Sequence, residues 1–579
     1  MRIDTTHKIA GILVPVFALR HARDFGIGDA KAMRDAIDFC ADNSIGVLQI
    51  LPINETGGDN SPYNAISSVA LDPVYVTLAP GAVPNLTEQM ISNMAPEHLL
   101  SELRQGPVNY PRVKELKVQL LWEAFNAFEK EHINQSTAEA QRLKDFENEN
   151  SRWLEPYSLY RTLIDEHSGN AVWTQWEADL HSYELAKVKV ASQSNAKEVQ
   201  RSRQFWSFVQ WVAFGQWRDL KDYAEQRSVK LMGDLPFGVS RYSVDVWSEP
   251  QLFDLQWSCG APPEKFFQGD KFVCEWGQNW GMPLYSWDAH RQENFAWWRQ
   301  RVQHLTNLFH YFRIDHVLGF FRVYGFPWIP ERNHEFIDLT KEQASTLTGG
   351  ELPHFIPRSD DEPEDAQANA KEGGDLLKVL IEAAGPDGIV AEDLGMVPEY
   401  VRPLIRELGM AGFSIPIFER VSDEDREFKP KETLPELSLA TYGTHDHQPI
   451  AAFYDDLIKR WHGPEGDQGW HEVQRLMRFL GQDDQNPPTS FTDDLHRVFL
   501  RVLLETPCWL AALMITDILG TSQRFNEPGL SGDYNWSQRL DRPLQQYLDQ
   551  PRYGDKIRYF RDQIKQTDRA PLVSVKAQA

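Results

Sequence analysis

Three acidic residues, Asp315, Glu392 and Asp446, each lie at the end of an apolar, strand-like run of the chain. Because the carboxyl ends of parallel strands meet at one face of an α/β barrel, we expect the three side chains to share a pocket. Carboxylates held this close repel one another, so one of them should stay protonated near neutral pH. A protonated and an ionised carboxyl group in one pocket predict acid/base chemistry there.

Cleavage of a glycosidic bond requires such a pair. In a retaining mechanism one carboxylate attacks the anomeric carbon and the other protonates the leaving oxygen, with the two carboxyl groups about 5 to 5.5 Å apart. We assign the attack to Asp315 and the proton donation to Glu392. Arg313 precedes Asp315 by two residues and shares its strand face, so it can keep Asp315 ionised. Asp446 and His445 would hold sugar hydroxyls as the ring flattens.

Other interpretations of these residues remain open. Asp315 could cap the following helix while Arg313 forms a structural ion pair with it. Carboxylate clusters also bind Mg²⁺ or Ca²⁺, so a metallo-hydrolase is the second chemistry that the residues allow. Against a metal, the acids lie beside Arg313, His316 and His445 rather than in a dense oxygen cage. No pair of histidines has the helical i, i+4 spacing of a zinc site with a nearby acid.

Strand-like and helical patterns alternate along the chain. Helical periodicity occurs at 32–41, 113–128, 204–223, 295–311, 376–384, 401–408 and 494–504. Strand-like runs occur at 47–53, 73–78, 229–236, 312–317, 388–395, 412–418, 437–446 and 509–516. Eight strands alternating with helices predict a (β/α)8 TIM barrel.

The remaining segments predict insertions in one catalytic domain that spans residues 1–579. Residues from about 85 to 228 hold mainly helical pattern, which predicts a helical insertion subdomain between barrel strands. Residues from about 258 to 285 are rich in Gly, Pro and aromatics, which is typical of a lid or substrate-binding loop. The acidic segment 359–374 is expected to be a solvated surface excursion. We expect no separate C-terminal β-sandwich domain.

Composition narrows the classes of partner. The 579 residues carry a formal charge of -25, which disfavours binding to nucleic acid and to anionic membranes. Much of the aromatic content, nineteen Trp and eighteen Tyr, should belong to the core, but aromatic faces also stack on sugar rings. Tyr63 in a turn-rich loop is a candidate stacking platform, or it simply packs on that loop. The apolar segment 9–19 imitates a signal peptide, but it continues into globular sequence and no run is long enough to cross a bilayer. The four cysteines show no CxxC pair, so we expect reduced thiols and a cytoplasmic protein.

An ordered set of short motifs resembles the 4-α-glucanotransferase (amylomaltase, or disproportionating enzyme) family, which is related to the α-amylases. The motifs occur in sequence order over most of the chain: Gly26-Ile27-Gly28-Asp29, Ser61-Pro62-Tyr63, Gly233-Asp234-Leu235-Pro236, Ser243-Val244-Asp245-Val246-Trp247, Gly277-Gln278-Asn279-Trp280-Gly281, Arg313-Ile314-Asp315-His316, Ala391-Glu392-Asp393-Leu394-Gly395, Gly443-Thr444-His445-Asp446 and Asn526-Glu527-Pro528-Gly529.

The resemblance implies retaining transfer of a 1,4-α-glucan segment to the 4-hydroxyl group of glucose or another glucan. It implies Asp315 as nucleophile, Glu392 as acid/base and Asp446 as transition-state stabiliser. It also implies a set of substrate-binding residues: Tyr63, Asp245, Phe266, Trp280, Arg313, His445, Asn526 and Pro528. Maltooligosaccharides and α-1,4-glucans are the implied donors and acceptors, and the family needs no metal or organic cofactor.

The chain departs from the family pattern at His447 and at Lys265, and the second departure bears on acceptor binding because a lysine cannot stack as an aromatic ring does. His447 follows Asp446 where the family usually has Asn, and Lys265 stands in the lid loop where an aromatic residue is usual. The same carboxylates would also serve an α-glucan hydrolase of the amylase type if water reached the glycosyl-enzyme before a sugar. A non-catalytic glucan-binding scaffold is the third alternative. The presence of all three carboxylates disfavours it.

Overall fold

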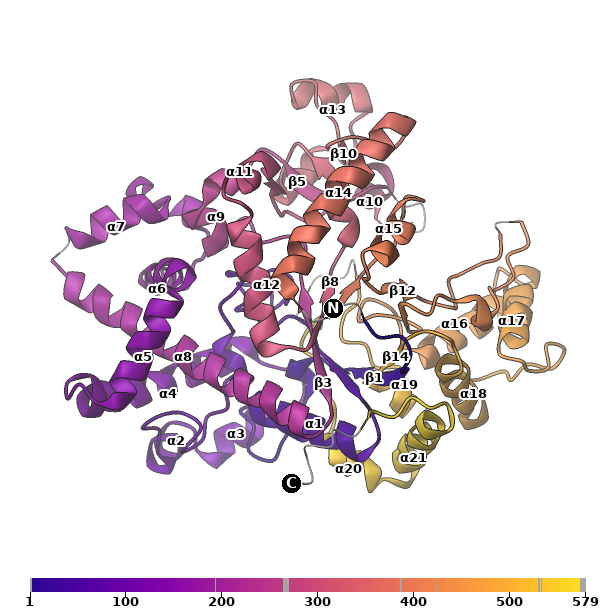
Figure 1. Ribbon diagram of the computed structural model, residues 1–579, viewed down its shortest axis with the longest axis horizontal. Helices are drawn as coiled ribbons and strands as arrows, with labels where there is room; N and C mark the ends of the chain where they lie inside the picture. Colours follow the sequence, from indigo (N-terminus) through magenta and orange to yellow (C-terminus); the bar gives the residue numbers. More distant parts are fainter. Residues whose placement is uncertain are drawn as a thin grey trace.

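A parallel eight-stranded barrel lies at the centre of the computed structural model, which describes residues 3–192, 194–263, 270–385, 388–422, 424–528, 532 and 534–572 (Figure 1). The strands run around the sheet in the order β11-β8-β3-β2-β1-β14-β13-β12. A bridge between Val390 and Ala411 joins the first and last strands of this order, β11 and β12, and closes the barrel. The strands are β1 (Ile9–Leu13), β2 (Val47–Gln49), β3 (Lys230–Leu235), β8 (Tyr311–Ile314), β11 (Gly388–Ala391), β12 (Gly412–Ser414), β13 (Ser438–Ala440) and β14 (Leu510–Met514).

The predicted (β/α)8 TIM barrel is confirmed, but one barrel strand was not predicted and one predicted strand is wrong. The first barrel strand is β1, which lies inside the apolar segment that imitates a signal peptide. Residues 73–78, predicted as a strand, instead contain a 3₁₀ turn at Pro73–Tyr75. The Nζ atom of Lys117 donates to the carbonyl oxygens of Val74 and Val76 at 2.6 and 2.8 Å. These carbonyl groups are therefore satisfied by a side chain instead of a neighbouring strand.

Inward-pointing side chains of the strands fill the barrel. A buried cluster of Val47, Met232, Val390, Phe413 and Leu439 occupies its interior, together with Trp509, Leu510 and Ala512. Because side chains alternate along a strand, the inward positions that follow this packed layer lie toward the carboxyl ends of the strands. The functional face of the barrel therefore begins where the apolar layer stops.

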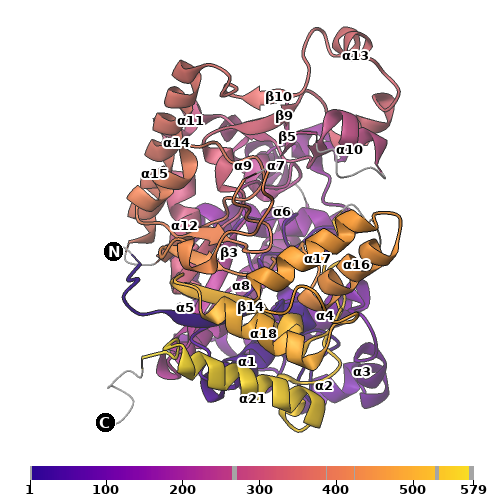
Figure 2. The same ribbon diagram turned by 90° about the vertical axis from the view of Figure 1, so that its right-hand side faces the viewer.

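Helices surround the barrel. Between β2 and β3 lie the helices at the left of Figure 1. After β14 the described residues form three helices and no further strand, and the last helix, α21, lies at the bottom in both ribbon views (Figures 1 and 2). α1 has Asp29 as its N-cap, and the Asp29 carboxylate accepts from the backbone N–H groups of Lys31 and Ala32. The helices before β8 are α1 (Ala30–Asp42), α2 (Glu88–Met94), α3 (Glu97–Leu103), α4 (Tyr110–Phe128), α5 (Ala138–Glu149), α6 (Ser151–Glu166), α7 (Tyr183–Ala191), α8 (Ala196–Gln226), α9 (Val244–Ser248), α10 (Lys271–Trp276), α11 (Trp287–Gln292) and α12 (Ala296–Leu308). Those after β8 are α13 (Lys341–Leu347), α14 (Pro363–Ala384), α15 (Val401–Glu407), α16 (Ile450–His462), α17 (Asp467–Phe479), α18 (Asp493–Leu504), α19 (Ile515–Leu519), α20 (Leu544–Leu548) and α21 (Pro551–Gln566).

The acidic segment 359–374 is not a simple surface excursion. Most of it forms the first turns of α14, and Gly373 and Gly374 are buried there. A Cβ atom at Gly373 would lie 2.2 Å from the ring of Phe321, so only glycine lets α14 pack this closely. Gly373 is therefore required by packing, while a Cβ atom at Gly374 would lie 3.1 Å from the Leu404 side chain.

A second, antiparallel sheet lies beyond the barrel, at the top of Figures 1 and 2 and at the opposite end of the molecule from α21. Its strand order is β10-β9-β5-β6. The strands are β5 (Ser258–Ala261), β6 (Gln278–Asn279), β9 (Val323–Phe326) and β10 (His354–Ile356), and β4 (Phe253–Asp254) pairs separately with β7 (Leu284–Tyr285). We call β5, β6, β9 and β10 the outer sheet.

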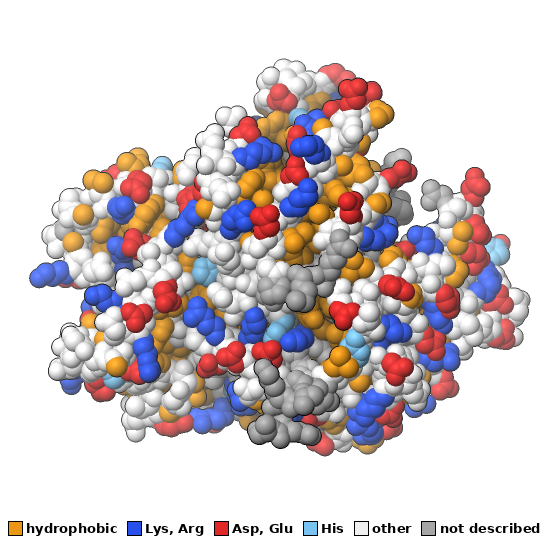
Figure 3. All heavy atoms as spheres, viewed as in Figure 1, with side chains coloured by type: hydrophobic (Ala, Val, Ile, Leu, Met, Phe, Trp, Pro, Cys, Tyr) orange, Lys and Arg blue, Asp and Glu red, His pale blue; other side chains and the backbone are white. Residues whose placement is uncertain are grey.

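Acidic and basic side chains are interspersed on the face seen in Figure 3, where no single sign of charge dominates. On this face the acidic excess of the chain, -25 overall, does not gather into a single patch. Within the described ranges, no helix is both long and apolar enough to span a membrane.

Candidate active site

Strand register places the charged residues of β3, β8 and β11 side by side. Asp234 on β3 is the direct neighbour of Arg313 on β8. Ala391 on β11 is the neighbour of Ile314 on β8, so Glu392 and Asp315 emerge together one residue later. Residues so far apart in sequence thus meet because parallel strands end at a common face.

Arg313 is the centre of the site. Its Nη1 atom donates to both carboxylate oxygens of Asp234 at 2.9 and 2.8 Å, and its Nη2 atom donates to Asp315 Oδ1 at 2.8 Å. The same Nη2 atom lies 3.9 Å from Glu392 Oε2. Burial opposes the charge of Arg313, but Asp234 and Asp315 outweigh it and raise the pKa of the guanidinium. A permanent positive charge therefore stands between the two proposed catalytic carboxylates.

Glu392 is buried and fixed by backbone donors. Its carboxyl oxygens accept from the N–H groups of His316 at 2.8 Å and Leu394 at 2.9 Å. Burial raises the pKa of Glu392 to about 7, with Asp315 adding to the rise and Arg313 opposing it. A carboxyl group with this pKa holds its proton at neutral pH about half of the time, as a general acid/base requires.

This pKa predicts the pH dependence of the reaction. Glu392 must be protonated to donate to a leaving oxygen, and its protonated fraction falls as pH rises through about 7. We expect kcat/KM for a maltooligosaccharide to decline about tenfold per pH unit on the alkaline side of this value. Initial rates measured from about pH 5 to about pH 9 check this. A profile that stays flat to the alkaline end would contradict the assignment.

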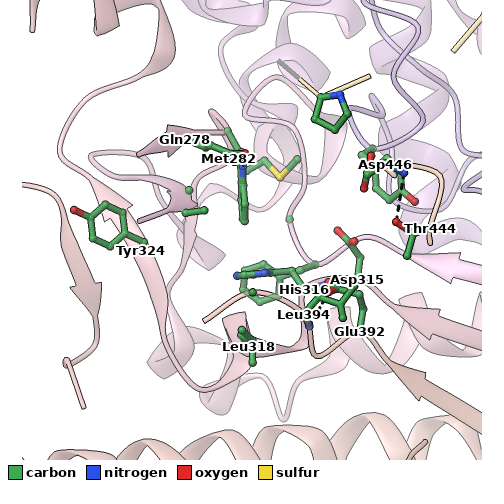
Figure 4. Close-up of a pocket in the computed structure, with 18 of the residues that line it drawn as sticks. Gln278, Met282, Asp315, His316, Leu318, Tyr324, Glu392, Leu394, Thr444 and Asp446 are labelled. Carbon is green, nitrogen blue, oxygen red and sulfur yellow. Dashed lines mark hydrogen bonds between the residues drawn. The ribbon is translucent and has the colours of Figure 1, made fainter. Parts of the chain in front are cut away.

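Asp446 approaches the same cavity from the loop after β13 (Figure 4). Its Oδ1 atom accepts from Asn526 Nδ2 at 2.6 Å, and Oδ2 lies 3.2 Å from His445 Nε2. Although partial burial opposes ionisation, His445 and Asn526 outweigh it and lower the pKa of Asp446. Asp446 therefore stays ionised at neutral pH, unlike Glu392.

The loop that carries Asp446 is held at both ends. The Thr444 hydroxyl group accepts from the N–H group of Asp446 at 3.3 Å. Asp517, which follows β14, accepts from the first N–H group of α16 at Ile450, at 2.8 Å. Burial raises the pKa of Asp517 to about 7. Asp517 thus anchors the far end of the loop without reaching the cavity.

Tyr63 connects the two halves of the site. Its hydroxyl group donates to Asp234 Oδ2 at 2.7 Å, and its ring stacks on His445 with centroids 5.2 Å apart. Trp536 packs against both rings. The hydroxyl group of Tyr63 is thus hydrogen-bonded to another side chain of the protein, and the ring forms part of the cavity wall.

A cavity of about 830 Å³ brings most of the predicted residues together. This volume is at the upper end of the usual range for small-molecule sites. Nine of the predicted residues line it: Tyr63, Trp280, Arg313, Asp315, Glu392, His445, Asp446, Asn526 and Pro528. Trp280 lies edge-on to His316, with centroids 4.9 Å apart. Phe266 lies outside the described residues, so its predicted role stays a prediction.

The structure does not place Asp245 in this cavity. Its carboxylate accepts from the backbone N–H and hydroxyl groups of Ser68 and from Trp297 Nε1. The residue lies in the first turn of the short helix α9, and its side chain reaches the Ser68 loop. Its contacts therefore indicate a structural role.

Asp234 is the functional residue that the sequence interpretation missed. It lies in the quoted motif Gly233-Asp234-Leu235-Pro236, and its position near the end of a strand was the available signal. Its side chain is 1% exposed and holds both Arg313 and Tyr63. Asp234 does not line the cavity, so it positions the residues that do.

We expect Asp234→Asn to lower kcat roughly 10- to 100-fold, because Arg313 would lose the partner that fixes it against Asp315. KM should change less. Asp245→Asn is the matched control, since it also alters a buried aspartate but one outside the cavity, and its effect on kcat should be smaller. Steady-state kinetics with thermal unfolding of both variants provide the measurement. Equal losses of kcat would contradict the separation of their roles.

No group of three or more His, Cys, Asp and Glu side chains in the described part of the chain could hold a metal ion. The cation between the carboxylates is instead Arg313.

Comparison with known proteins decides the family. The sequence profile of the 4-alpha-glucanotransferases matches residues 14–545. The chain belongs to the 4-alpha-glucanotransferase family. The 4-alpha-glucanotransferase of Chlamydia caviae is 28% identical over 558 residues, covering 94% of this chain and 93% of the relative. That of Aquifex aeolicus is 28% identical over 546 residues, covering 92% and 96%.

Solved structures show the same fold. The amylomaltase from Streptococcus agalactiae, in complex with acarbose, aligns with a TM-score of 0.72 and 20% identity, covering 97% of this chain and 100% of that one. The amylomaltase from Corynebacterium glutamicum aligns with a TM-score of 0.75 and 18% identity, covering 96% and 75%. The sequence profile and the relatives confirm the family assignment made from the motifs, and with it the 4-alpha-glucanotransferase activity of the enzyme.

Proposed function

We propose that the enzyme transfers a 1,4-α-glucan segment with retention of configuration, through a covalent glycosyl-enzyme on Asp315. The observation that carries this is the position of Arg313 Nη2, 2.8 Å from Asp315 and 3.9 Å from Glu392. Two carboxyl groups near one nitrogen atom favour a retaining pair, whose carboxyl groups lie about 5 to 5.5 Å apart, over an inverting pair, which needs room for a water molecule between them.

In the first step, Asp315 attacks the anomeric carbon and the bond to the leaving oxygen breaks. Glu392 gives its proton to that oxygen, and the shortened glucan leaves. The ionised Asp446 faces the positive charge that develops on the sugar ring, and stabilises it electrostatically. Arg313 holds the carboxylate of Asp315 in orientation through the hydrogen bond from its Nη2 atom.

In the second step, an acceptor glucan presents its 4-hydroxyl group to the same carbon. Glu392, now ionised, takes the proton of that hydroxyl group, the new glycosidic bond forms, and Asp315 leaves as a carboxylate. Two inversions at one carbon restore the α configuration. Glucose, maltooligosaccharides and longer α-1,4-glucans are the proposed acceptors.

The substrate range and compartment complete the proposal. An amylomaltase of the same fold is known in complex with acarbose, which supports an α-glucan in the cavity. Tyr63, Trp280, His445, Asn526 and Pro528 would bind the sugar at the reaction centre. Cys40, Cys259 and Cys508 are buried thiols, which suits a reducing cytoplasm.

Incubation of the purified enzyme with maltotriose alone tests the function. A transferase should form glucose together with a ladder of longer maltooligosaccharides, and EDTA in a parallel tube should not change the products. Separation of the products by size provides the measurement. Glucose and maltose without longer products would identify a hydrolase, and unchanged maltotriose would contradict the proposed donor.

A further inference from the structure

One face of the outer sheet presents aromatic rings to the catalytic cavity. Tyr324 on β9 is the direct cross-strand neighbour of Phe355 on β10, and on its other side Tyr324 pairs with Gly260 on β5. Side chains at directly paired positions share one face of a sheet. Tyr324, Phe355 and Gly260 all line the cavity that contains Asp315.

The two rings are fixed in orientation. Their centroids are 5.3 Å apart at an interplanar angle of 78°. The Tyr324 hydroxyl group donates to the carbonyl oxygen of Pro353 at 3.2 Å. Both residues are half-buried, so each keeps part of its ring surface open. We call Tyr324 and Phe355 the aromatic wall.

Arg322 supports the wall from one side. Its guanidinium carbon lies 3.6 Å from the centroid of Phe355, and its Nε atom donates to Asp360. Asp360 also accepts from the Tyr400 hydroxyl group and from Asn369 Nδ2, each at 3.0 Å. The network holds Phe355 in place before any ligand arrives, which lowers the entropy cost of binding.

The wall is remote from the reaction centre. Figure 4 shows Tyr324 at the far side of the cavity from Asp446 and Thr444, with Gln278, Met282 and His316 between them. Among the contacts of the described residues, neither Tyr324 nor Phe355 is hydrogen-bonded to an ionisable side chain of the proposed mechanism. The wall therefore has no part in the bond-breaking chemistry but lies on the path of a substrate that extends along the cavity.

We propose that the aromatic wall is a sugar-binding subsite that holds glucosyl units distant from the cleaved bond, and that it makes the enzyme favour long α-1,4-glucans over maltotriose. Open aromatic surface suits the apolar faces of sugar rings, and pockets commonly combine such surface with a few polar groups. Arg322, which also lines the cavity, supplies donors for sugar hydroxyl groups. This inference rests on the proposed glucan transfer and names the chain length that the site selects.

The test compares substrates of two lengths. For Tyr324→Ala and Phe355→Ala, the ratio of kcat/KM for maltoheptaose to kcat/KM for maltotriose should fall about tenfold, the effect expected from losing one aromatic contact. Tyr324→Phe keeps the ring and should retain the ratio of the unaltered enzyme. Tyr559→Ala, which removes a partly buried ring on α21 outside the cavity, should also retain it.

A binding measurement separates this inference from the proposed function. In an Asp315→Asn background, titration calorimetry with maltoheptaose should show about tenfold weaker binding when Tyr324→Ala is added. If Tyr324→Ala weakened the binding of maltotriose and maltoheptaose equally, the wall would only stabilise the cavity. Unchanged maltoheptaose binding together with an unchanged ratio of kcat/KM values would also overturn the subsite. Absence of transfer by the unaltered enzyme would refute the proposed function while the calorimetry still tests the wall.

Discussion

Asp315→Asn should lower the rate of glucan transfer by at least about a thousandfold, because the amide cannot form the glycosyl-enzyme. The substitution keeps the size of the side chain, and the amide oxygen can still accept from Arg313 Nη2, which contacts Asp315 at 2.8 Å. Folding should therefore be retained, and thermal unfolding provides the control. The loss should appear in kcat with little change in maltoheptaose binding.

The covalent step can be observed directly. Glu392→Gln mixed with maltotriosyl fluoride should accumulate the glycosyl-enzyme, since fluoride leaves without an acid but the acceptor lacks its base. Intact-protein mass after rapid acid quenching should show one added maltotriosyl group. The Asp315→Asn/Glu392→Gln double variant should show none. A mass increase that survives the Asp315 substitution would mean that another residue is the nucleophile.

Glu392→Gln should slow transfer from maltooligosaccharides by roughly 10² to 10⁴, because the leaving oxygen is no longer protonated. The first step with maltotriosyl fluoride should slow far less, since that leaving group needs no proton. The two rates are obtained from maltotriose turnover and from burst-phase fluoride release. Their ratio separates the loss of proton donation from any other effect of the substitution on the enzyme.

The pH profile supplies a second readout for this variant. The alkaline decline near pH 7 that we assign to Glu392 should be absent from its residual activity. Persistence of that decline would contradict the assignment of Glu392 as the acid/base, and so would near-normal transfer from maltotriose.

The sequence predicted the barrel and its catalytic carboxylates because both depend on local pattern. Asp315 and Glu392 follow directly on their strands, and the neighbouring register of β8 and β11 brings them together. The family motifs then fixed the activity, which the comparisons confirm. The individual catalytic roles of these residues stay predictions for the experiments above.

The errors arose where tertiary contacts decide the conformation. An apolar run such as 9–13 reads equally well as a leader segment or a strand, and only its pairing with β2 and β14 makes it β1. The apolar run 73–78 is as buried as a strand, but its carbonyl groups bond to Lys117 on α4, far along the chain. Neither partner can be inferred from local periodicity.

The two aspartates Asp234 and Asp245 show the limit of motif matching. Both lie in quoted motifs of acidic and apolar residues, and the position of Asp234 near the end of a strand does not by itself decide between them. Register does, because it sets Asp234 directly beside Arg313. The aromatic wall was missed for the same reason, since Tyr324 and Phe355 lie 31 positions apart and meet only through β9 and β10.

The shared position of Asp315 and Glu392 beside Arg313 means that the proton affinity of Glu392 alternates during turnover. The negative charge of Asp315 helps to raise the pKa of Glu392 in the free enzyme. Once Asp315 is esterified by the sugar that charge is gone, while the positive charge of Arg313 remains. Glu392 then holds a proton less tightly at the moment when it must accept one from the incoming hydroxyl group. The bond formed at one carboxylate thus resets the other from acid to base, with no movement of the chain.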